Sequence, residues 1–359
     1  MKHLLSLILA VWLTQPLAAQ VRGEVQIPNL NGFVTLKCDF HIHTVFSDGN
    51  VWPTVRIAEA YREGLDAISI TDHIEYRPHN EDINADHNRS FDIAAPIAKA
   101  AGIILIKGSE ITRAMPPGHS NALFLTDSNP LDQQEYMDAF EAAKQQNAFI
   151  FWNHPGWDAQ QPDTTLWWPE HTKLLEQGMM MGMEVVNGTE YFPEAHQWCL
   201  DKKLTMLGNS DVHDPIQAQF DFANGAHRTM TLVFAKEATQ EGIREALFAG
   251  RTAVYNEEVL VGEERYLKEL FENALDITVE KRGNSVRITV KNNSDLVFHL
   301  KKTQHDTRLV YFRNYTIVPQ GTHVITVRLQ EGIQGGDMNF NVENLLVQPN
   351  QGMNYTIKI

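Results

Sequence analysis

The sequence has few cysteines and, beyond its first residues, no long hydrophobic run. Cys38 and Cys199 are the only thiols in 359 residues, so the chain must be stabilised by a hydrophobic core rather than by a disulfide framework. Because no other apolar run reaches about 18 residues, we predict no membrane span. Export would permit a disulfide between the two thiols, but both lie in apolar or helical surroundings, and we expect two buried free thiols.

Positive charge is also scarce. The chain has 30 Lys and Arg against 45 Asp and Glu, a net charge of −15, and no basic run. Neutralising a phosphate backbone needs a high density of Lys and Arg, so binding to nucleic acid by charge is disfavoured. The sequence has no nucleophile-elbow motif, internal repeat or low-complexity tract. An acidic chain remains compatible with a metal site, because carboxylates are metal ligands.

The first residues have the pattern of a secretory signal peptide. Lys2 and His3 precede an apolar run over residues 4–13, and small or permissive residues precede Gln20. This run is too short to cross a bilayer as a helix. We therefore expect residues 1–19 to be removed, and the mature chain, which begins near Gln20, to be periplasmic or secreted.

Short apolar runs alternate with amphipathic stretches from about residue 34 to residue 255. Repeated strand–helix units predict an α/β fold with a parallel sheet, and both an open doubly wound sheet and a closed barrel fit this pattern. The expected strands cover residues 35–40, 66–71, 103–107, 121–125, 148–152, 182–186, 205–207 and 229–234. The expected helices cover residues 54–63, 91–101, 133–146, 194–203 and 239–249.

The pattern changes after Gly262. Helical periodicity continues for about ten residues, and alternating strands separated by turns then follow to the end of the chain. We predict a signal peptide over residues 1–19, an α/β domain over 28–260, a helical linker over 261–274 and a small β-sandwich domain over 275–359. The last domain is expected to pack on the first or to mediate an accessory contact.

Histidines and carboxylates gather at the ends of the predicted strands. The first strand ends in Asp39-Phe40-His41-Ile42-His43, and the two-residue period of a strand places both imidazoles on one face. Since the carboxyl ends of parallel strands meet on one side of the fold, such groups should share one site. Buried together, they would be costly unless they coordinate a metal. The groups expected at this site are Asp39, His41, His43, Asp48, Asp72, His73, Glu110, His119, His154, Asp211 and His213, of which His119 stands at the entrance of its strand.

These motifs resemble those of the PHP family, named for polymerase and histidinol phosphatase. The resemblance covers roughly residues 36–255. It implies a distorted (β/α)7 barrel, two to three divalent metal ions such as Zn, Mn or Fe, and hydrolysis of phosphate esters. The exported location and the β-rich tail look like a secreted bacterial branch of the family. The motifs are DFHIHT from Asp39, SDG from Ser47, TDH from Thr71, GSE from Gly108, NHP from Asn153 and NSDVH from Asn209.

Carried over onto this sequence, the resemblance implies three metal positions. The first would be held by His41, His43, Glu110 and Asp211. The second would be held by Asp48, His73 and His213. The third would be held by His119 and His154, with Glu110 as a bridge. Asp48 stands where some members have histidine, and this harder ligand favours Mn or Fe over Zn.

The resulting hypothesis is a metal-dependent phosphoric ester hydrolase. A metal-bridging hydroxide would attack a small-molecule phosphomonoester or phosphodiester at a di- or trinuclear site. Among the catalytic residues, Asp39 and Asp72 are expected to hold ligand imidazoles by hydrogen bonds. Proton transfer is an alternative role for Asp72. A metal-dependent amide or lactone hydrolase is the alternative function, since the same site can attack a carbonyl carbon.

The substrate contacts are predicted from residue type and position. Arg113, which follows Glu110 closely, is expected to reach the phosphate and to take part in catalysis. Arg228 is a second candidate, with a surface ion pair as its alternative. Trp157 is expected to form an apolar wall for the leaving group, with core packing as its alternative. The polar loop over residues 75–89 is expected to lie over the site. A non-enzymatic scaffold that binds through its β-domain is disfavoured, because each ligand group is intact.

Overall fold

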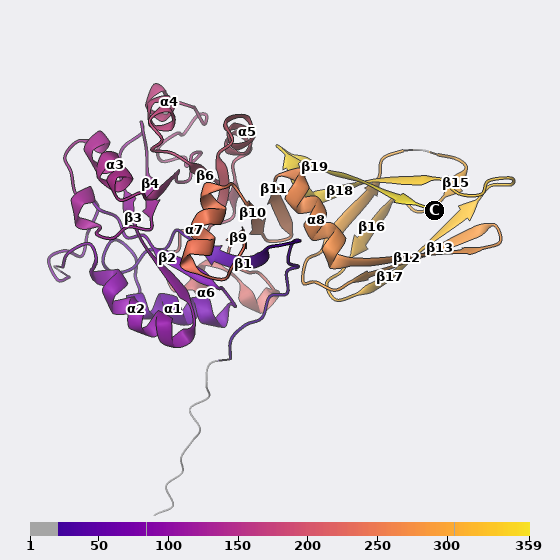
Figure 1. Ribbon diagram of the computed structural model, residues 1–359, viewed down its shortest axis with the longest axis horizontal. Helices are drawn as coiled ribbons and strands as arrows, with labels where there is room; N and C mark the ends of the chain where they lie inside the picture. Colours follow the sequence, from indigo (N-terminus) through magenta and orange to yellow (C-terminus); the bar gives the residue numbers. More distant parts are fainter. Residues whose placement is uncertain (1–20, 84, 305) are drawn as a thin grey trace, which may run out of the picture.

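The computed structural model describes residues 21–83, 85–304 and 306–359 of the chain. The expected signal peptide, residues 1–19, lies outside these described residues. Figure 1 shows an elongated molecule, with an α/β domain at one end, a β-rich domain at the other and helix α8 (Glu264–Ala274) at their junction. Within the described part of the chain, no helix has the length and apolar character that a membrane span requires.

The α/β domain is built on short strands that are mostly buried. Every residue of β2 (Ala67–Ile70), β5 (Phe149–Trp152) and β9 (Met230–Ala235) is buried, as expected for apolar strands covered on both faces. The other strands of this domain are β1 (Val34–Asp39), β3 (Ile104–Ile111), β4 (Ser120–Leu123), β6 (Gly182–Asn187), β7 (Glu190–Tyr191), β8 (Thr205–Asn209), β10 (Thr252–Asn256) and β11 (Val259–Gly262).

These strands form a distorted barrel. Strands β1, β2 and β3 are parallel, as are β5, β6 and β8, and β4 lies antiparallel between β3 and β5. The ring closes just beyond β1 and β8, where His43 N donates to Val212 O over 3.1 Å and Asp211 N donates to His41 O over 2.9 Å. The closed barrel expected from the resemblance is therefore confirmed, and an open doubly wound sheet is excluded.

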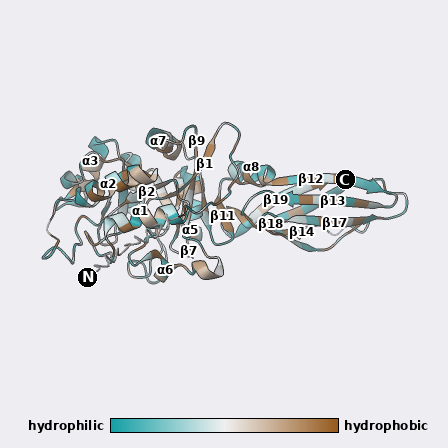
Figure 2. Ribbon diagram, turned by 90° about the horizontal axis from the view of Figure 1, so that it is seen from below, coloured by the Kyte–Doolittle hydropathy of each residue, from teal (hydrophilic) through white to brown (hydrophobic). Residues whose placement is uncertain are grey.

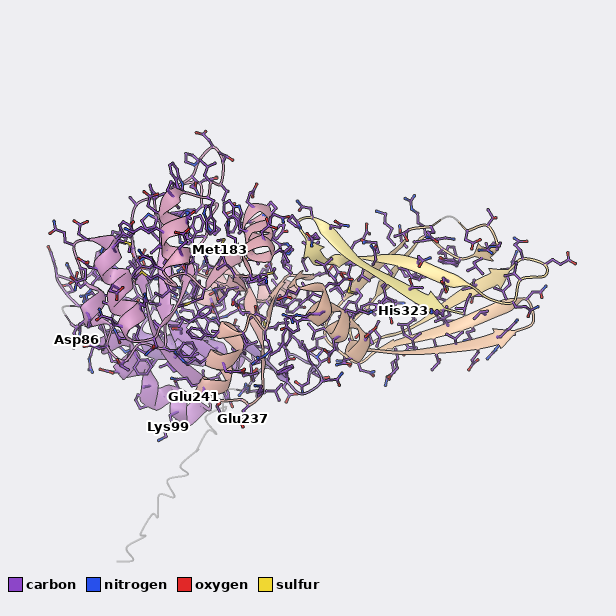
Figure 3. All side chains as sticks on the ribbon, turned by 45° about the horizontal axis from the view of Figure 1, so that its top comes forward. Asp86, Lys99, Met183, Glu237, Glu241 and His323 are labelled. Carbon is purple, nitrogen blue, oxygen red and sulfur yellow. The ribbon has the colours of Figure 1, made fainter. Side chains whose placement is uncertain are left out.

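Helices cover the outside of the barrel. Proline at the first turn of α1, α4 and α5 and the left-handed Gly102 after α2 are common start and stop signals. Figure 3 labels Lys99 and Glu241, which point outward, and Met183, which is fully buried. The helices are α1 (Pro53–Arg62), α2 (Arg89–Ala101), α3 (Tyr136–Gln145), α4 (Pro169–Glu176), α5 (Pro193–Lys202), α6 (Ile216–Gln219) and α7 (Gln240–Phe248), with 3-10 turns η1 (Asn129–Leu131) and η2 (Phe222–Asn224).

The second domain is an antiparallel β-sandwich. One sheet has the order β12-β13-β17-β15, and the other pairs β16, β14, β18 and β19. Buried and exposed residues alternate along β13 and β17, so each has one face toward the core, and Figure 2 shows residues of both hydropathies along these strands. The strands are β12 (Leu275–Arg282), β13 (Ser285–Asn292), β14 (Phe298–Lys302), β15 (Leu309–Val310), β16 (Asn314–Ile317), β17 (Thr322–Leu329), β18 (Asp337–Gln348) and β19 (Gln351–Lys358).

The two domains share a sheet and a core. Strand β11 pairs in parallel with β18, with Leu260 opposite Leu345 and Val261 opposite Leu346. Helix α8 buries Leu267, Leu270 and Phe271 in a hydrophobic cluster that draws residues from both domains. Residues 261–274, which we expected to be a helical linker, contain this helix, and the helix is packed at the junction of the two domains.

We predict that the Phe271→Ala variant loses about 3–5 kcal/mol of unfolding free energy, because it leaves a cavity in this shared core. The Phe271 ring is 1% exposed and its centroid lies 4.9 Å from that of Phe298 and 4.8 Å from that of Tyr355. Urea unfolding would measure the loss. Phe312→Ala is the control, because Phe312 is 80% exposed. Equal stability of the two variants would contradict a shared core.

Candidate metal centre

All of the predicted ligand residues meet at one rim of the barrel. Residues that follow β1, β2, β5 and β8 reach this rim because the carboxyl ends of parallel strands point the same way. His119 precedes β4, and it reaches the same rim because β4 runs antiparallel to its neighbours. Glu110 lies inside β3, which continues to Ile111 and not only to residue 107 as expected.

The Glu110 carboxylate lies at the middle of this group and is fully buried. Its Oε2 lies 3.1 Å from His41 Nε2, 3.2 Å from His43 Nε2 and 3.2 Å from His73 Nδ1. Its Oε1 lies 2.8 Å from His119 Nδ1 and 3.9 Å from His154 Nε2. One carboxylate thus touches imidazoles from four strands.

Asp211 joins the same group from the segment after β8. Its Oδ1 lies 3.1 Å from His41 Nε2 and 3.0 Å from His43 Nε2. The backbone of Asp211 has φ of 52° and that of His154 has φ of 30°, a region that non-glycine residues rarely adopt. The His41 carbonyl and the Glu184 carboxylate accept from the N–H groups of Asp211 and His154, respectively, and hold both backbones in place.

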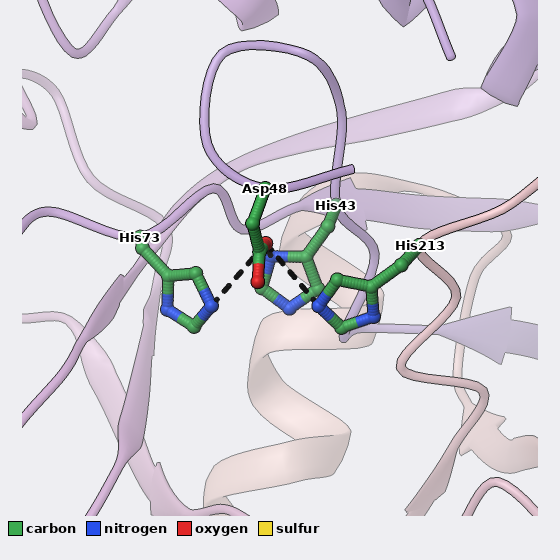
Figure 4. A group of neighbouring side chains, drawn as sticks. All are labelled: His43, Asp48, His73 and His213. Carbon is green, nitrogen blue, oxygen red and sulfur yellow. Dashed lines mark ion pairs between the residues drawn. The ribbon is translucent and has the colours of Figure 1, made fainter. Parts of the chain in front are cut away.

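A second group surrounds Asp48 (Figure 4). Asp48 Oδ1 lies 3.4 Å from His73 Nε2, 3.2 Å from His213 Nε2 and 3.7 Å from His43 Nδ1. Gly49 permits the tight loop that presents this aspartate, since a Cβ there would lie 2.7 Å from Thr44 N. The two groups are continuous, because His43 and His73 belong to both.

Hydrogen bonds to the outer ring nitrogens turn the Nε2 atoms inward. His41 Nδ1 lies 2.9 Å from Glu184 Oε1, and His213 Nδ1 lies 2.8 Å from the Asp211 carbonyl oxygen. An ionised carboxylate and a carbonyl only accept, so each Nδ1 carries the proton. The Nε2 lone pairs of these histidines are then free for a metal, the arrangement common among ligand histidines.

The charges in the centre depend on one another. Burial raises the pKa of Glu110, but His73, His41 and His119 outweigh it and bring the pKa well below its usual value. Burial lowers the pKa of His41, but the carboxylates of Asp211, Glu184 and Glu110 outweigh it and bring the pKa well above its usual value. Carboxylates are thus kept ionised and attract positive charge into the barrel. A divalent cation supplies the same charge that these protons supply.

Several of these buried atoms have no hydrogen-bond partner, which is costly unless a cation satisfies them. Two ligands bound to one ion at about 2.1 Å lie roughly 3–3.5 Å apart, and most of the distances above match this spacing. The mixture of imidazole and carboxylate suits Zn, Mn or Fe. The residues therefore fit a multinuclear divalent metal site. The atoms without a partner are His43 Nε2, Asp48 Oδ1, Glu110 Oε1, His119 Nδ1, His154 Nδ1 and Asp211 Oδ1.

Comparison with known proteins agrees with this architecture. An Ig-like domain family model matches residues 275–358. The chain is 59% identical to a two-domain protein from Bacteroides vulgatus that contains a predicted PHP-like metal-dependent phosphoesterase, with a TM-score of 0.94 over 95% of this chain and 100% of that one. This chain belongs to the PHP-like family. The family expected from the motifs is thereby confirmed.

More distant structures are similar to parts of the PHP-like chain. A proposed metal-dependent phosphoesterase from Bifidobacterium adolescentis is 17% identical, with a TM-score of 0.40 over 49% of this chain and 87% of that one. An amidohydrolase from Chromobacterium violaceum is 16% identical, with a TM-score of 0.38 over 50% of this chain and 88% of that one. These values are too low to carry an argument. No curated protein matches the chain significantly.

Asp39 and Asp72 hold backbone segments of the PHP-like chain, not ligand imidazoles as we expected. Asp39 accepts from Ser210 N over 3.1 Å and from Ser210 Oγ over 2.5 Å, which fixes the residue before Asp211. Asp72 accepts from Thr44 N over 2.7 Å and from Ser47 Oγ over 2.9 Å, which fixes the loop before Asp48. Both aspartates therefore position segments that carry predicted metal ligands, and they do so from outside the centre.

The predicted substrate residues are only partly brought to the centre. Arg228 is fully buried and donates to Asp39 and Glu63, so it does not reach the site. Arg113 donates to the carbonyl oxygens of Gln133 and Gln134 and pairs with Glu75 at 2.8 Å. These bonds hold its guanidinium away from the metal ligands. Trp157 does lie at the centre, with its ring centroid 5.1 Å from that of His154.

Sequence reasoning missed Glu184 in the PHP-like site. This buried carboxylate in β6 contacts His41 Nδ1 and accepts from His154 N over 2.7 Å. It also accepts from the side-chain amides of Asn187 and Asn209. A glutamate inside an otherwise apolar strand was the available signal, because a buried charge there needs partners.

We predict that Glu184→Gln lowers metal affinity about 10- to 100-fold, because the amide cannot fix the His41 tautomer as the carboxylate does. Metal titration followed by calorimetry would measure the change. Glu194→Gln, at an exposed position of helix α5, is the matched control. Native metal affinity in Glu184→Gln would show that Glu184 does not orient His41.

We predict that Arg228→Met costs about 3–5 kcal/mol of stability, because it leaves Asp39 and Glu63 without their cation. Chemical unfolding would measure this loss of stability. The KM for substrate would test the role first expected for Arg228, which was direct contact with the substrate. A raised KM with unchanged stability would support direct substrate contact and contradict the buried ion pairs.

Proposed function

We propose that this protein is a metal-dependent phosphoric ester hydrolase. The proposal is carried by one observation, the convergence of unpartnered imidazole and carboxylate atoms around Glu110. The similarity to the Bacteroides vulgatus protein supports a hydrolase that depends on metals. Bound divalent metals would lower the pKa of a coordinated water and neutralise charge on the phosphoryl oxygens.

The ligand sets proposed from the family agree with the distances. His41, His43 and Asp211 have ligand atoms within 4.8 Å of one another, and Glu110 lies against the same two imidazoles. His43, Asp48, His73 and His213 form the group at the second position. Glu110 meets His119 and His73 in one group, and His154 and His41 in another. We therefore assign Glu110 as the bridging ligand and His119 and His154 to the third position.

The protein's own residues would prepare the reaction by position and by charge. The buried carboxylates hold positive charge at the rim, and the closed barrel fixes the imidazoles before substrate arrives. A cavity of about 550 Å³ opens over these ligands, within the usual size of small-molecule sites. The proposed substrate is a small phosphate ester, either a monoester or a diester, and the protein is proposed to act after export.

The direct test uses the chain from Gln20 onward, loaded with Mn, Zn or Fe and analysed for metal content. We predict hydrolysis of p-nitrophenyl phosphate or bis-p-nitrophenyl phosphate. Asp211→Asn should lose activity and metal together, because it removes a ligand charge between His41 and His43. The control is Asp201→Asn, an exposed residue of α5. A loaded protein that cleaves neither ester but cleaves amides or lactones would establish the alternative hydrolase.

A further inference from the structure

Two aromatic side chains line the cavity beside the metal centre. Tyr76 is 53% exposed and Trp157 is 42% exposed. The Trp157 ring centroid lies 5.7 Å from that of His119, and the Tyr76 centroid lies 5.9 Å from that of His73. Exposed aromatic surface is thus present directly beside predicted ligands, where an organic group attached to phosphorus would lie.

All of the charged side chains that line the same cavity belong to the proposed metal centre. The charged described residues that line it are carboxylates and histidines, without lysine or arginine among them. Arg113 is held elsewhere by Glu75. The amide of Asn187 donates to Glu184 and Asp211. Beyond the proposed metal ligands, a second anionic group on a substrate would therefore find no lysine or arginine among the described lining residues with which to pair.

We infer that Tyr76 and Trp157 select phosphate esters whose organic group is a planar, uncharged aromatic ring system, such as an aryl or nucleobase-bearing group. This inference rests on the proposed function and names its substrate class. A flat ring gains contact by stacking on the indole and phenol rings. Small aliphatic esters lack this contact, and a second anionic group would find no lysine or arginine in the described cavity lining with which to pair.

The experiment measures binding of non-hydrolysable analogues to the metal-loaded protein by calorimetry. Phenylphosphonate and methylphosphonate carry the same charged group, so their affinity ratio reports the ring alone. We expect phenylphosphonate to bind at least about fivefold more tightly. A carboxylate on the ring, as in 4-carboxyphenylphosphonate, should bring no gain in affinity over phenylphosphonate, because no described lysine or arginine lines the cavity to pair with it.

Variants separate the aromatic contact from general damage. Trp157→Ala should bring the phenyl-to-methyl ratio toward one, and methylphosphonate affinity and metal content are measured alongside to detect damage to the centre. Trp157→Phe should keep most of the ratio, and Tyr76→Ala should reduce it. Phe248→Ala is the matched control, since Phe248 is 45% exposed and lies outside this cavity.

Equal binding of the two phosphonates, or a ratio that survives both alanine variants, would overturn the inference. Tighter binding of the carboxylated analogue would also overturn it, because it would reveal a cationic subsite. Failure of the proposed function is seen separately. A loaded protein without any phosphate-ester hydrolysis refutes that function, whereas an active hydrolase without a phenyl preference refutes only the aromatic selection.

Discussion

A buried carboxylate surrounded by imidazoles is the interaction on which the rest of the α/β domain depends. Glu110 has no exposed surface, so its charge is tolerated only if positive charge lies within contact distance. Histidines from the neighbouring strands provide that charge when they are protonated. A bound divalent metal would provide it in place of those protons. The barrel must therefore close with its strand ends in one register. A small shift of any strand would leave either a buried anion or an unpartnered imidazole.

Where the barrel closes, an unusual backbone conformation and the hydrogen bonds that hold it lie beside this centre. Asp211 adopts a left-handed backbone, and it does so where the segments after β1 and β8 pair. A chain of contacts from the partly exposed Glu63 through the buried Arg228 and Asp39 to Ser210 holds this segment from behind. Rigid support of this kind limits the movement of metal ligands and preorganises the site. The ion pairs of Arg228 thus act on the centre through the backbone.

The Ig-like domain is joined to the α/β domain through the shared sheet. Strand β18 continues the sheet beyond β11, and α8 packs across the junction. An exposed edge at β11 would be open to pairing with other chains, and β18 covers it. The second domain therefore covers the edge strand β11 of the first domain. Its hydrophobic residues also pack against α8.

The sequence by itself indicated the candidate ligands, most of the strands and helices of the α/β domain, and the change to a β-rich region after Gly262, but not α4 or β10. These features follow from local periodicity, and the two-residue strand period alone places His41 and His43 together. The tertiary structure decided the partners of Asp39, Asp72, Arg228 and Glu184 and the packing of α8. A hydrogen bond between residues far apart along the chain leaves no local pattern, because its geometry exists only after the barrel closes. Residue type thus indicates which groups need partners, and only the closed fold decides which partners they find.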